Sequence, residues 1–324
     1  MRILNAEPQQ YSGEARRILA AIGEVVDAPL SQAELQERIH GFDVVMVRLG
    51  LQVDRAVIDA GSHLQAIVTA TTGLDHIDVG YAKTRQVDVL SLRGETEFLR
   101  SIHATAEHTW ALLLALIRHL PEAVVSVRQG QWNRDAYRGR ELSGRRLGII
   151  GLGRIGEQVA RYGQTFGMSV AAFSPGREEW PDGVERCQQL EQLLRRSDVL
   201  SIHVPLMPAT SGMLGSRELA LLPAGAVVVN TARGGVLDET ALMERLTSGH
   251  LAGAALDVIN GELDATARLQ SRLVEFARTH PQLLITPHIG GATVESMART
   301  EIFMAEKLQR WVEAKRRTSP CAVS

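Results

Sequence analysis

The chain has 324 residues, of which 45% are apolar and 22% are charged, and its formal net charge is −2. This length suits two globular domains of ordinary composition. The near-neutral balance, without a long block of like charge, argues against nucleic acid or an acidic membrane as a partner.

The two cysteines, Cys187 and Cys321, are far apart and fall in no metal-ligand or redox spacing. We therefore expect a reduced, cytoplasmic protein with no disulfide and no bound metal. The first ten residues lack the apolar core of a signal peptide, and the apolar run WALLLALI is too short to span a bilayer. The basic segment EAKRRTSP is interpreted as a solvated terminus.

The first 92 residues alternate short apolar runs with helical patterns. Strands are predicted at MRILNAE, DVVMVR, QAIVTATTG and VDVLSL. Helices are predicted at GEARRILAAIG and at SQAELQERI, where Ser31 and Glu34 have the spacing of a capping box. This alternation predicts a parallel sheet with helices on its faces.

A long apolar helix, TAEHTWALLLALIRHLPEA, is predicted next and is expected to end near Pro121. The polar segment RQGQWNRDAYRGRELSGRR follows it. A second alternating series begins at LGIIGLGRIG, with strands at SVAAF, VLSIHVP, AVVVNTA, AGAALDV and LLITPH. One helix of this series, DETALMERLTSG, is capped by Asp238 and stopped by Gly249. The predicted fold class is α/β, with two Rossmann-like domains built on parallel sheets.

The segment GLGRIG places Gly151, Gly153 and Gly156 in a G-x-G-x-x-G pattern between a predicted strand and a predicted helix. In that context the pattern indicates a dinucleotide site. The first glycine permits the tight turn, the second lets the pyrophosphate approach the backbone, and the third lets the helix pack closely on the strand. The helix N-terminus adds free N–H groups and a partial positive charge.

The second strand of this domain ends without an acidic residue. Ser174 stands where a carboxylate would bind the ribose of NAD and repel the extra phosphate of NADP. Ser174 and Arg177 could instead contact that phosphate. We therefore expect both NADP and NAD to be accepted, with a lean to NADP. Alternatively, Arg177 is a solvated loop residue.

Three further signals follow in order: Arg233 in NTARGG, Glu262 five residues after Asp257, and His288 in TPHIGG. Arg233 and His288 follow predicted strands, and in open α/β sheets ligands bind outside the carboxyl ends of the strands. At this point the chain resembles the D-isomer-specific 2-hydroxyacid dehydrogenases, a family that includes D-3-phosphoglycerate dehydrogenase and glyoxylate/hydroxypyruvate reductase. TGLDHIDV, ATAEHTWALLLALIR, GRELSGRRLGIIGLGRIG and TPHIGGATVESM carry the resemblance.

The resemblance implies that residues 1–99 and 291–324 form a flavodoxin-like substrate domain. Residues 100–290 would form the NAD(P)-binding Rossmann domain, with the active site in the cleft between the two. It also implies that the catalytic residues are Arg233, Glu262 and His288. No C-terminal regulatory domain of the kind found in many phosphoglycerate dehydrogenases is expected.

The chemistry of these three side chains agrees with that assignment. Reduction of a 2-oxo acid needs a hydride from the nicotinamide, a proton for the developing alkoxide and a cation for the carboxylate. His288 can supply the proton, because imidazole titrates near neutral pH. A neighbouring Glu262 would favour the imidazolium and orient the ring. Arg233 has a planar guanidinium suited to carboxylate and carbonyl oxygens.

Other positions gain roles only through the resemblance. Thr72 and Gly73 correspond to the loop that holds the substrate carboxylate. Arg48 is either a ligand for a distal anion of the substrate or a surface arginine at a strand end. Glu107 and His108 are interpreted as polar residues that pack the helix. The expected cofactor contacts, besides the three glycines, Ser174 and Arg177, are Thr105, Arg154, Ile155, His203, Pro205, Thr231 and Asp257.

The chain departs from the family pattern after Glu262. Leu263 stands where many relatives have proline, and the segment before LLITPH is longer than usual. Within DATARLQSRLVEFARTH the apolar residues fall at roughly helical spacing, so we expect a helix where simpler relatives have a loop.

The expected function is hydride transfer between a nicotinamide cofactor and a D-2-hydroxy acid or its 2-oxo acid. One alternative is a non-catalytic NAD(H)-sensing binding protein of the corepressor type, and another is a phosphite dehydrogenase-like enzyme. Formate dehydrogenases resemble the chain less, because they have Gln where Glu262 stands. A homodimer is expected, because relatives reach across a dimer interface near Trp132 and the helix from Thr105 is very apolar.

Overall fold

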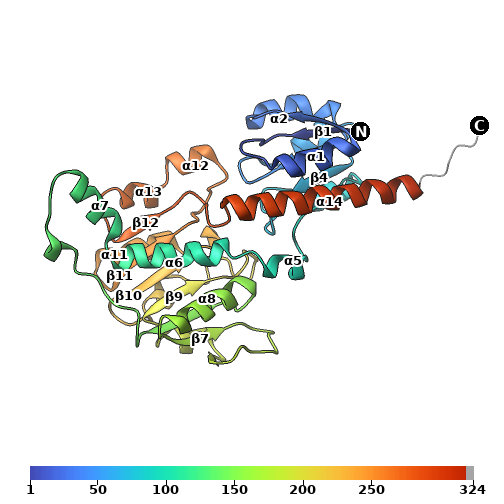
Figure 1. The fold of residues 1–324 in the computed structure, drawn as a ribbon. Helices are drawn as coiled ribbons and strands as arrows, with labels where there is room; N and C mark the ends of the chain where they lie inside the picture. The colour runs from blue at the N-terminus through green and yellow to red at the C-terminus, as the bar shows by residue number, and fades with distance from the viewer. Residues whose placement is uncertain (319–324) are drawn as a thin grey trace, which may run out of the picture. The chain divides into compact units, whose positions relative to one another are not determined.

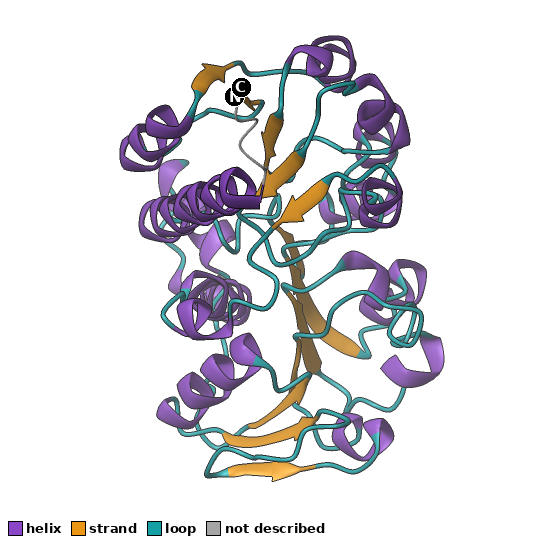
Figure 2. Cartoon of the chain, turned by 90° about the vertical axis from the view of Figure 1, so that its right-hand side faces the viewer, coloured by secondary structure: helices purple, strands orange, loops and turns teal. Residues whose placement is uncertain are grey.

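The structure is a computed structural model that describes residues 1–318. Residues 1–99, with the described residues from Ala292 onward, form one compact unit, and Arg100–Gly291 form the other. In each unit helices lie on both sides of a parallel sheet (Figures 1 and 2). The predicted fold class is therefore confirmed. Cys321 and the end of EAKRRTSP lie outside the described residues.

The first unit is built on a five-stranded sheet in the order β2-β1-β3-β4-β5. This is the flavodoxin-like order, in which the order of strand addition reverses between β1 and β3. The last helix, α14, packs on α1, and Figure 1 shows the two side by side. The elements are β1 Arg2–Asn5, α1 Gly13–Ile22, β2 Glu24–Asp27, α2 Gln32–Arg38, β3 Val44–Val47, α3 Arg55–Ala60, β4 Ala66–Thr69, α4 Val79–Thr84, β5 Asp88–Leu90, α5 Thr96–Arg100 and α14 Val294–Thr318.

The second unit is built on a seven-stranded sheet in the order β12-β11-β10-β9-β6-β7-β8. The series β8-β7-β6-β9-β10-β11 has the Rossmann order, with its reversal between β6 and β9. The elements are α6 Ala104–Ile117, α7 Leu120–Arg128, β6 Arg146–Ile150, α8 Arg154–Thr165, β7 Ser169–Phe173, β8 Val184–Arg186, α9 Leu190–Leu194, β9 Val199–Ile202, α10 Ser216–Leu219, β10 Ala226–Asn230, α11 Glu239–Thr247, β11 Leu251–Leu256, α12 Ala265–Leu269, α13 Arg272–Ala277 and β12 Leu283–Ile285.

Burial explains why the central strands read as continuous apolar runs. Every residue of β3, β4, β9 and β10 is buried, since helices cover both faces of each sheet. Local signals set the ends of the helices. Ser31 and Glu34 form the predicted capping box of α2, and Asp238 caps α11 by accepting from the Thr240 and Ala241 amides.

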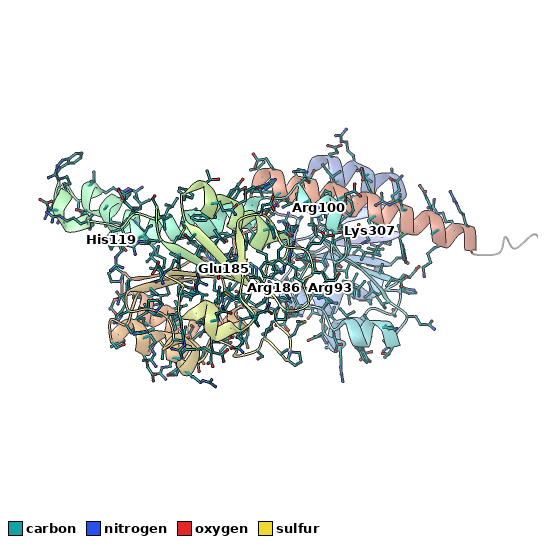
Figure 3. The ribbon with its side chains drawn as sticks, turned by 90° about the horizontal axis from the view of Figure 1, so that it is seen from below. Arg93, Arg100, His119, Glu185, Arg186 and Lys307 are labelled. Atoms are coloured by element: carbon teal, nitrogen blue, oxygen red, sulfur yellow. The ribbon has the colours of Figure 1, made fainter. Side chains whose placement is uncertain are left out.

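The prediction that the long apolar helix ends near Pro121 is wrong. The helix α6 ends at Ile117, and His119 adopts a left-handed conformation with φ of 51° before α7 begins. Figure 3 labels His119 at this junction. Pro121 lies in the first turn of α7, where its missing N–H costs no helical hydrogen bond.

The helical prediction for the segment after Glu262 is confirmed, but two helices form instead of one. The α12 helix is capped by Asp264 and ends at Leu269. Ser271 then caps α13 by accepting from the Val274 amide at 3.3 Å. A serine at this position favours a new helix start over continuation of the old one.

Among residues 1–318 no single helix is long and apolar enough to cross a membrane. Thr96–Ile117 and Leu120–Arg128 pass that test only as a pair, which is bent by 63° at the break. Cys187 is buried in the second unit, and burial raises the pKa of its thiol.

Candidate active site

His288 and Glu262 meet at the carboxyl edge of the seven-stranded sheet. Glu262 follows β11 and His288 follows β12, and these strands are parallel neighbours. His288 Nδ1 lies 2.7 Å from Glu262 Oε1. The side chains of His288 and Glu262 are 26% and 18% exposed, so the pair is partly screened from water. The structure therefore brings these two predicted residues together.

The backbone at His288 is held in a conformation that non-glycine residues seldom adopt. Its φ is 54°, and its amide donates to the carbonyls of Asp257 and Thr286 at 2.9 and 3.0 Å. The carboxylate of Asp257 accepts the amides of Ile289 and Gly290 at 2.9 and 2.7 Å. These bonds stabilise the turn that presents the imidazole.

Asp257 is almost fully buried, and side chains as well as amides donate to it. Thr286 Oγ1 donates to Asp257 Oδ1 at 2.6 Å, and His108 Nε2 lies 3.2 Å from the same oxygen. Burial raises the pKa of Asp257, but the hydrogen bonds from His108, Thr286 and the two amides outweigh it, so the pKa lies below its ordinary value. We refer to Asp257, Thr286 and His108 as the Asp257 network.

Of this network, only Asp257 was predicted from the sequence as a site residue, as a cofactor contact. The helix-packing interpretation of His108 is incomplete, because its ring pairs with Asp257 and also lies 3.0 Å from Thr286 Oγ1. Thr286 was not singled out. Its position two residues before His288, in the TPH segment, was the only available signal.

Arg233 follows β10, the third neighbouring strand at the same edge. Asn230 holds its turn by donating to the carbonyl of Arg233 at 2.9 Å and accepting the amide of Ala232 at 3.0 Å. A Cβ on Gly234 would lie 2.2 Å from the carbonyl carbon of Ile259. Only glycine therefore lets the Arg233 turn approach the loop that leads to Glu262.

The glycine turn after β6 has the shape that a dinucleotide requires. Gly151 has φ of 88°, and a Cβ there would lie 2.6 Å from the carbonyl oxygen of His203. A Cβ on Gly156 would lie 2.2 Å from the carbonyl oxygen of Gly151, so α8 packs directly against the turn. A Cβ on Gly153 would have no heavy atom within 4 Å, which leaves this face of the turn open. The residues present therefore fit a pyrophosphate at the N-terminus of α8.

The other predicted cofactor contacts lie around this sheet edge. Arg154 and Ile155 are the first two residues of α8, so their amides lie at its N-terminal end. Burial lowers the pKa of Arg154, whose Nη1 donates to the carbonyl of Ile102 at 2.9 Å. Thr231 shares a 2.8 Å hydrogen bond with Thr109, one turn after Thr105 on α6.

His203 follows β9, beside the glycine turn. Its Nε2 bonds Ser201 Oγ at 2.8 Å, while its buried Nδ1 has no hydrogen-bond partner within residues 1–318. Burial lowers the pKa of the imidazole to about 3, so the ring is neutral at pH 7. Pro205 accepts the Thr210 hydroxyl at 2.6 Å through its carbonyl.

The predicted substrate contacts all lie in the first unit. Thr72 is exposed, and Thr71 donates to the carbonyl of Gly73 at 2.7 Å. Arg48 follows β3 and donates to the carbonyl of Gln9 at 2.8 Å. It also forms an ion pair with Glu301 of α14, whose carboxylate is almost fully buried. Arg48 is thus no solvated surface residue.

A small pocket lies at the carboxyl ends of β1, β3 and β4. Arg48 and Glu301 line it, together with Tyr11 and Ala70. Burial raises the pKa of the Tyr11 phenol, so it stays protonated at neutral pH. Because ligands bind where the strand order reverses, this position suits a small-molecule site.

These features define a class of protein: a Rossmann-type unit with a nucleotide-binding glycine turn and a His–Glu pair at one sheet edge. The family model described as "D-isomer specific 2-hydroxyacid dehydrogenase, NAD binding domain" matches residues 110–290. The chain belongs to the D-isomer-specific 2-hydroxyacid dehydrogenase family.

Two curated relatives illustrate the range of the family. The chain is 38% identical over 285 residues to the hydroxypyruvate reductase of Thermotoga maritima, which covers 88% of this chain and 90% of that protein. It is 34% identical over 319 residues to the D-3-phosphoglycerate dehydrogenase of Bacillus subtilis, which covers 96% of this chain. The chain spans only 57% of the length of that relative.

Solved structures agree with this membership. The TT0316 protein from Thermus thermophilus has a TM-score of 0.85 and 33% identity, with 97% of each chain covered. The D-lactate dehydrogenase of Aquifex aeolicus, solved with NAD and lactic acid, has a TM-score of 0.80 and 27% identity. That comparison covers 98% of this chain and 97% of the other.

Proposed function

We propose that the chain transfers a hydride between a nicotinamide cofactor and a D-2-hydroxy acid or the corresponding 2-oxo acid. The observation that carries the proposal is the 2.7 Å His288–Glu262 pair, on the same sheet edge as the Arg233 turn and the glycine turn. Family membership supports the same chemistry. A hydroxypyruvate reductase and a D-lactate dehydrogenase are among the similar proteins.

Each side chain has a task in this reaction. The nicotinamide, when bound, supplies the hydride. Arg233 binds the substrate carboxylate through its guanidinium and thereby orients the carbonyl. His288 gives a proton to the oxygen that becomes the hydroxyl, and takes it back in the oxidation. Glu262 holds His288 Nδ1, which leaves Nε2 to face the substrate.

Residues of the first unit are also proposed to bind the substrate. The loop at Thr72 and Gly73 binds the carboxylate through backbone N–H groups. Arg48 and the pocket beside it contact the distal part of the substrate. The partner of the enzyme is thus a small-molecule acid.

We further propose that both NAD(H) and NADP(H) are accepted, because Ser174 leaves no carboxylate at the end of β7. A preference for NADP(H) depends on whether the guanidinium of Arg177 is available to a 2′-phosphate.

We also propose a homodimer formed through α6, α7 and the segment around Trp132. Support comes from the exposed apolar side chains of α7, where Leu120, Val124, Val125 and Val127 are about half exposed, and from Trp132, which is 88% exposed. Apolar side chains gathered on one helix mark a surface that another chain covers.

The test is absorbance at 340 nm with NADH and NADPH and a panel of small 2-oxo acids, and with NAD and NADP in the presence of formate or phosphite. Reduction of at least one 2-oxo acid is expected. Turnover of phosphite or formate alone would favour those enzymes instead. Cofactor binding without turnover of any substrate would favour the NAD(H)-sensing alternative.

A further inference from the structure

A carboxylate from α8 pairs with the loop that follows β7. Glu157 lies in the first turn of α8, and its Oε1 accepts from Arg177 Nη2 in an ion pair. The Arg177 side chain is only 23% exposed, so it is not a solvated loop residue.

A tight turn brings Arg177 back to the glycine turn. Pro175 and Gly176 are the central residues, Gly176 has φ of 76°, and the Arg177 amide donates to the carbonyl of Ser174 at 3.3 Å. Proline followed by a glycine of positive φ is the pattern of a type II turn. Because of this turn, Arg177 Nη1 reaches the carbonyl of Leu152 within GLGRIG.

The rest of the loop keeps the guanidinium in place. Arg177 Nε donates to the carbonyl of Glu179, and Trp180 Nε1 donates to the carbonyl of Arg177 at 3.4 Å. The guanidinium of Arg186 lies 5.4 Å from the centre of the Trp180 ring. Figure 3 labels Arg186 on β8, next to Glu185. The loop is therefore held at Arg177 by the glycine turn and at Trp180 by Arg186 of β8.

The pair lies where the adenosine ribose is expected. In Rossmann domains the ribose is bound at the end of the second strand, beside the glycine turn. Here the Gly151 amide donates to the carbonyl of Phe173, the last residue of β7, at 2.9 Å. Arg177 attracts a 2′-phosphate and Glu157 repels it, and the two charges sum to zero.

We propose that the Arg177–Glu157 pair sets the cofactor preference of this chain, with Glu157 restraining a cation that would otherwise bind the 2′-phosphate of NADP(H). The inference rests on the proposed function. Arg177 has five N–H donors, and three of them already donate to Leu152, Glu157 and Glu179. The 2′-phosphate of NADP(H) can bind the Arg177 guanidinium only by competing with the Glu157 carboxylate, which already accepts a hydrogen bond from it.

The experiment measures the dissociation constants of NADH and NADPH by the change in their fluorescence on binding, so it does not depend on turnover. In the wild type we expect NADPH to bind no tighter than NADH. Glu157→Gln should tighten NADPH about tenfold, or about 1.4 kcal/mol, and change NADH less than about twofold. Adding Arg177→Gln to Glu157→Gln should remove that gain.

The matched control is Glu178→Gln, which removes the same charge from an exposed position on the same loop. It should change the ratio of the two constants less than about twofold. The inference is overturned if Glu157→Gln leaves NADPH binding unchanged while NADH still binds. It is also overturned if the gain survives Arg177→Gln. Failure of the wild type to bind either nucleotide would overturn the proposed function itself.

Discussion

At the scale of single residues, the proposed chemistry depends on where one imidazole points. His288 has positive φ, and the bonds to its turn come from β11 and from the Asp257 carboxylate. In the proposed reaction, the carboxylate of Glu262 holds Nδ1 and leaves Nε2 for the substrate. The turn and the contact at Nδ1 thus come from different residues, so they can be tested separately.

His288→Ala is expected to lower kcat for 2-oxo acid reduction roughly 100- to 10,000-fold, because the reaction loses its general acid. The dissociation constants of the reduced cofactors should change little, since the proton donor is not an expected cofactor contact. Steady-state kinetics and cofactor titration measure the two effects. The control is His63→Ala, at an exposed position of the first unit. Near-wild-type turnover in His288→Ala would refute the assignment.

Thr286→Val is expected to lower kcat about tenfold, because the buried Asp257 carboxylate loses the Thr286 hydroxyl that donates to it at 2.6 Å. The KM for the 2-oxo acid should change much less, since Thr286 positions the His288 turn and does not itself bind substrate. Thr286→Ser keeps the hydroxyl and should recover most of kcat. Equal kcat values for Thr286→Val and Thr286→Ser would show that the Thr286 hydroxyl does not position the His288 turn.

At the scale of elements, the site depends on loops that follow neighbouring strands and touch one another. The turn after β10 presses on the loop after β11, and Gly234 is the point of contact. The apolar runs of these strands place the loops at one edge, and a single glycine then decides how close the loops lie.

Gly234→Ala is expected to lower kcat/KM at least about tenfold, because its Cβ would meet the backbone of Ile259 and Asn260 at 2.2 to 2.5 Å. Backbone atoms cannot move aside without displacing the loop that carries Glu262. Gly235→Ala is the matched control, since its Cβ would meet the end of the Leu206 side chain at 3.0 Å, which can shift. Equal kcat/KM values for the two variants would contradict the close-approach argument.

At the scale of the whole molecule, the apolar side chains of α7 and Trp132 are exposed to water in the single chain. A second copy of the chain would bury them, as the proposed homodimer requires. Such a patch on a single chain would carry a hydrophobic cost in water.

The wild type is expected to have the mass of a dimer in light scattering at micromolar concentration. Val124→Glu combined with Val127→Glu should shift the mass toward the monomer, because buried, unpaired carboxylates are costly at an interface. Glu substitutions at Val79 and Val294, which are also exposed but lie in the first unit, provide the control. A monomeric wild type would refute the proposed dimer.

The sequence by itself determined the fold class and the order of most elements. Buried parallel strands must be continuous apolar runs, and capping residues such as Ser31 and Asp238 mark helix starts through local hydrogen bonds. The glycine turn was also readable, because its spacing reflects backbone geometry that is local to the chain. The family resemblance correctly indicated the family.

Other features were decided only by tertiary structure. A sequence shows that α6 is apolar, but not that it breaks at His119 or that His108 reaches Asp257, which lies far along the chain beyond six strands of the sheet. The Arg177–Glu157 pair depends on a turn after β7 that points back to α8. Each of these contacts joins residues remote in sequence, and their distances follow from how strands and helices pack. Local patterns carry no information about that packing.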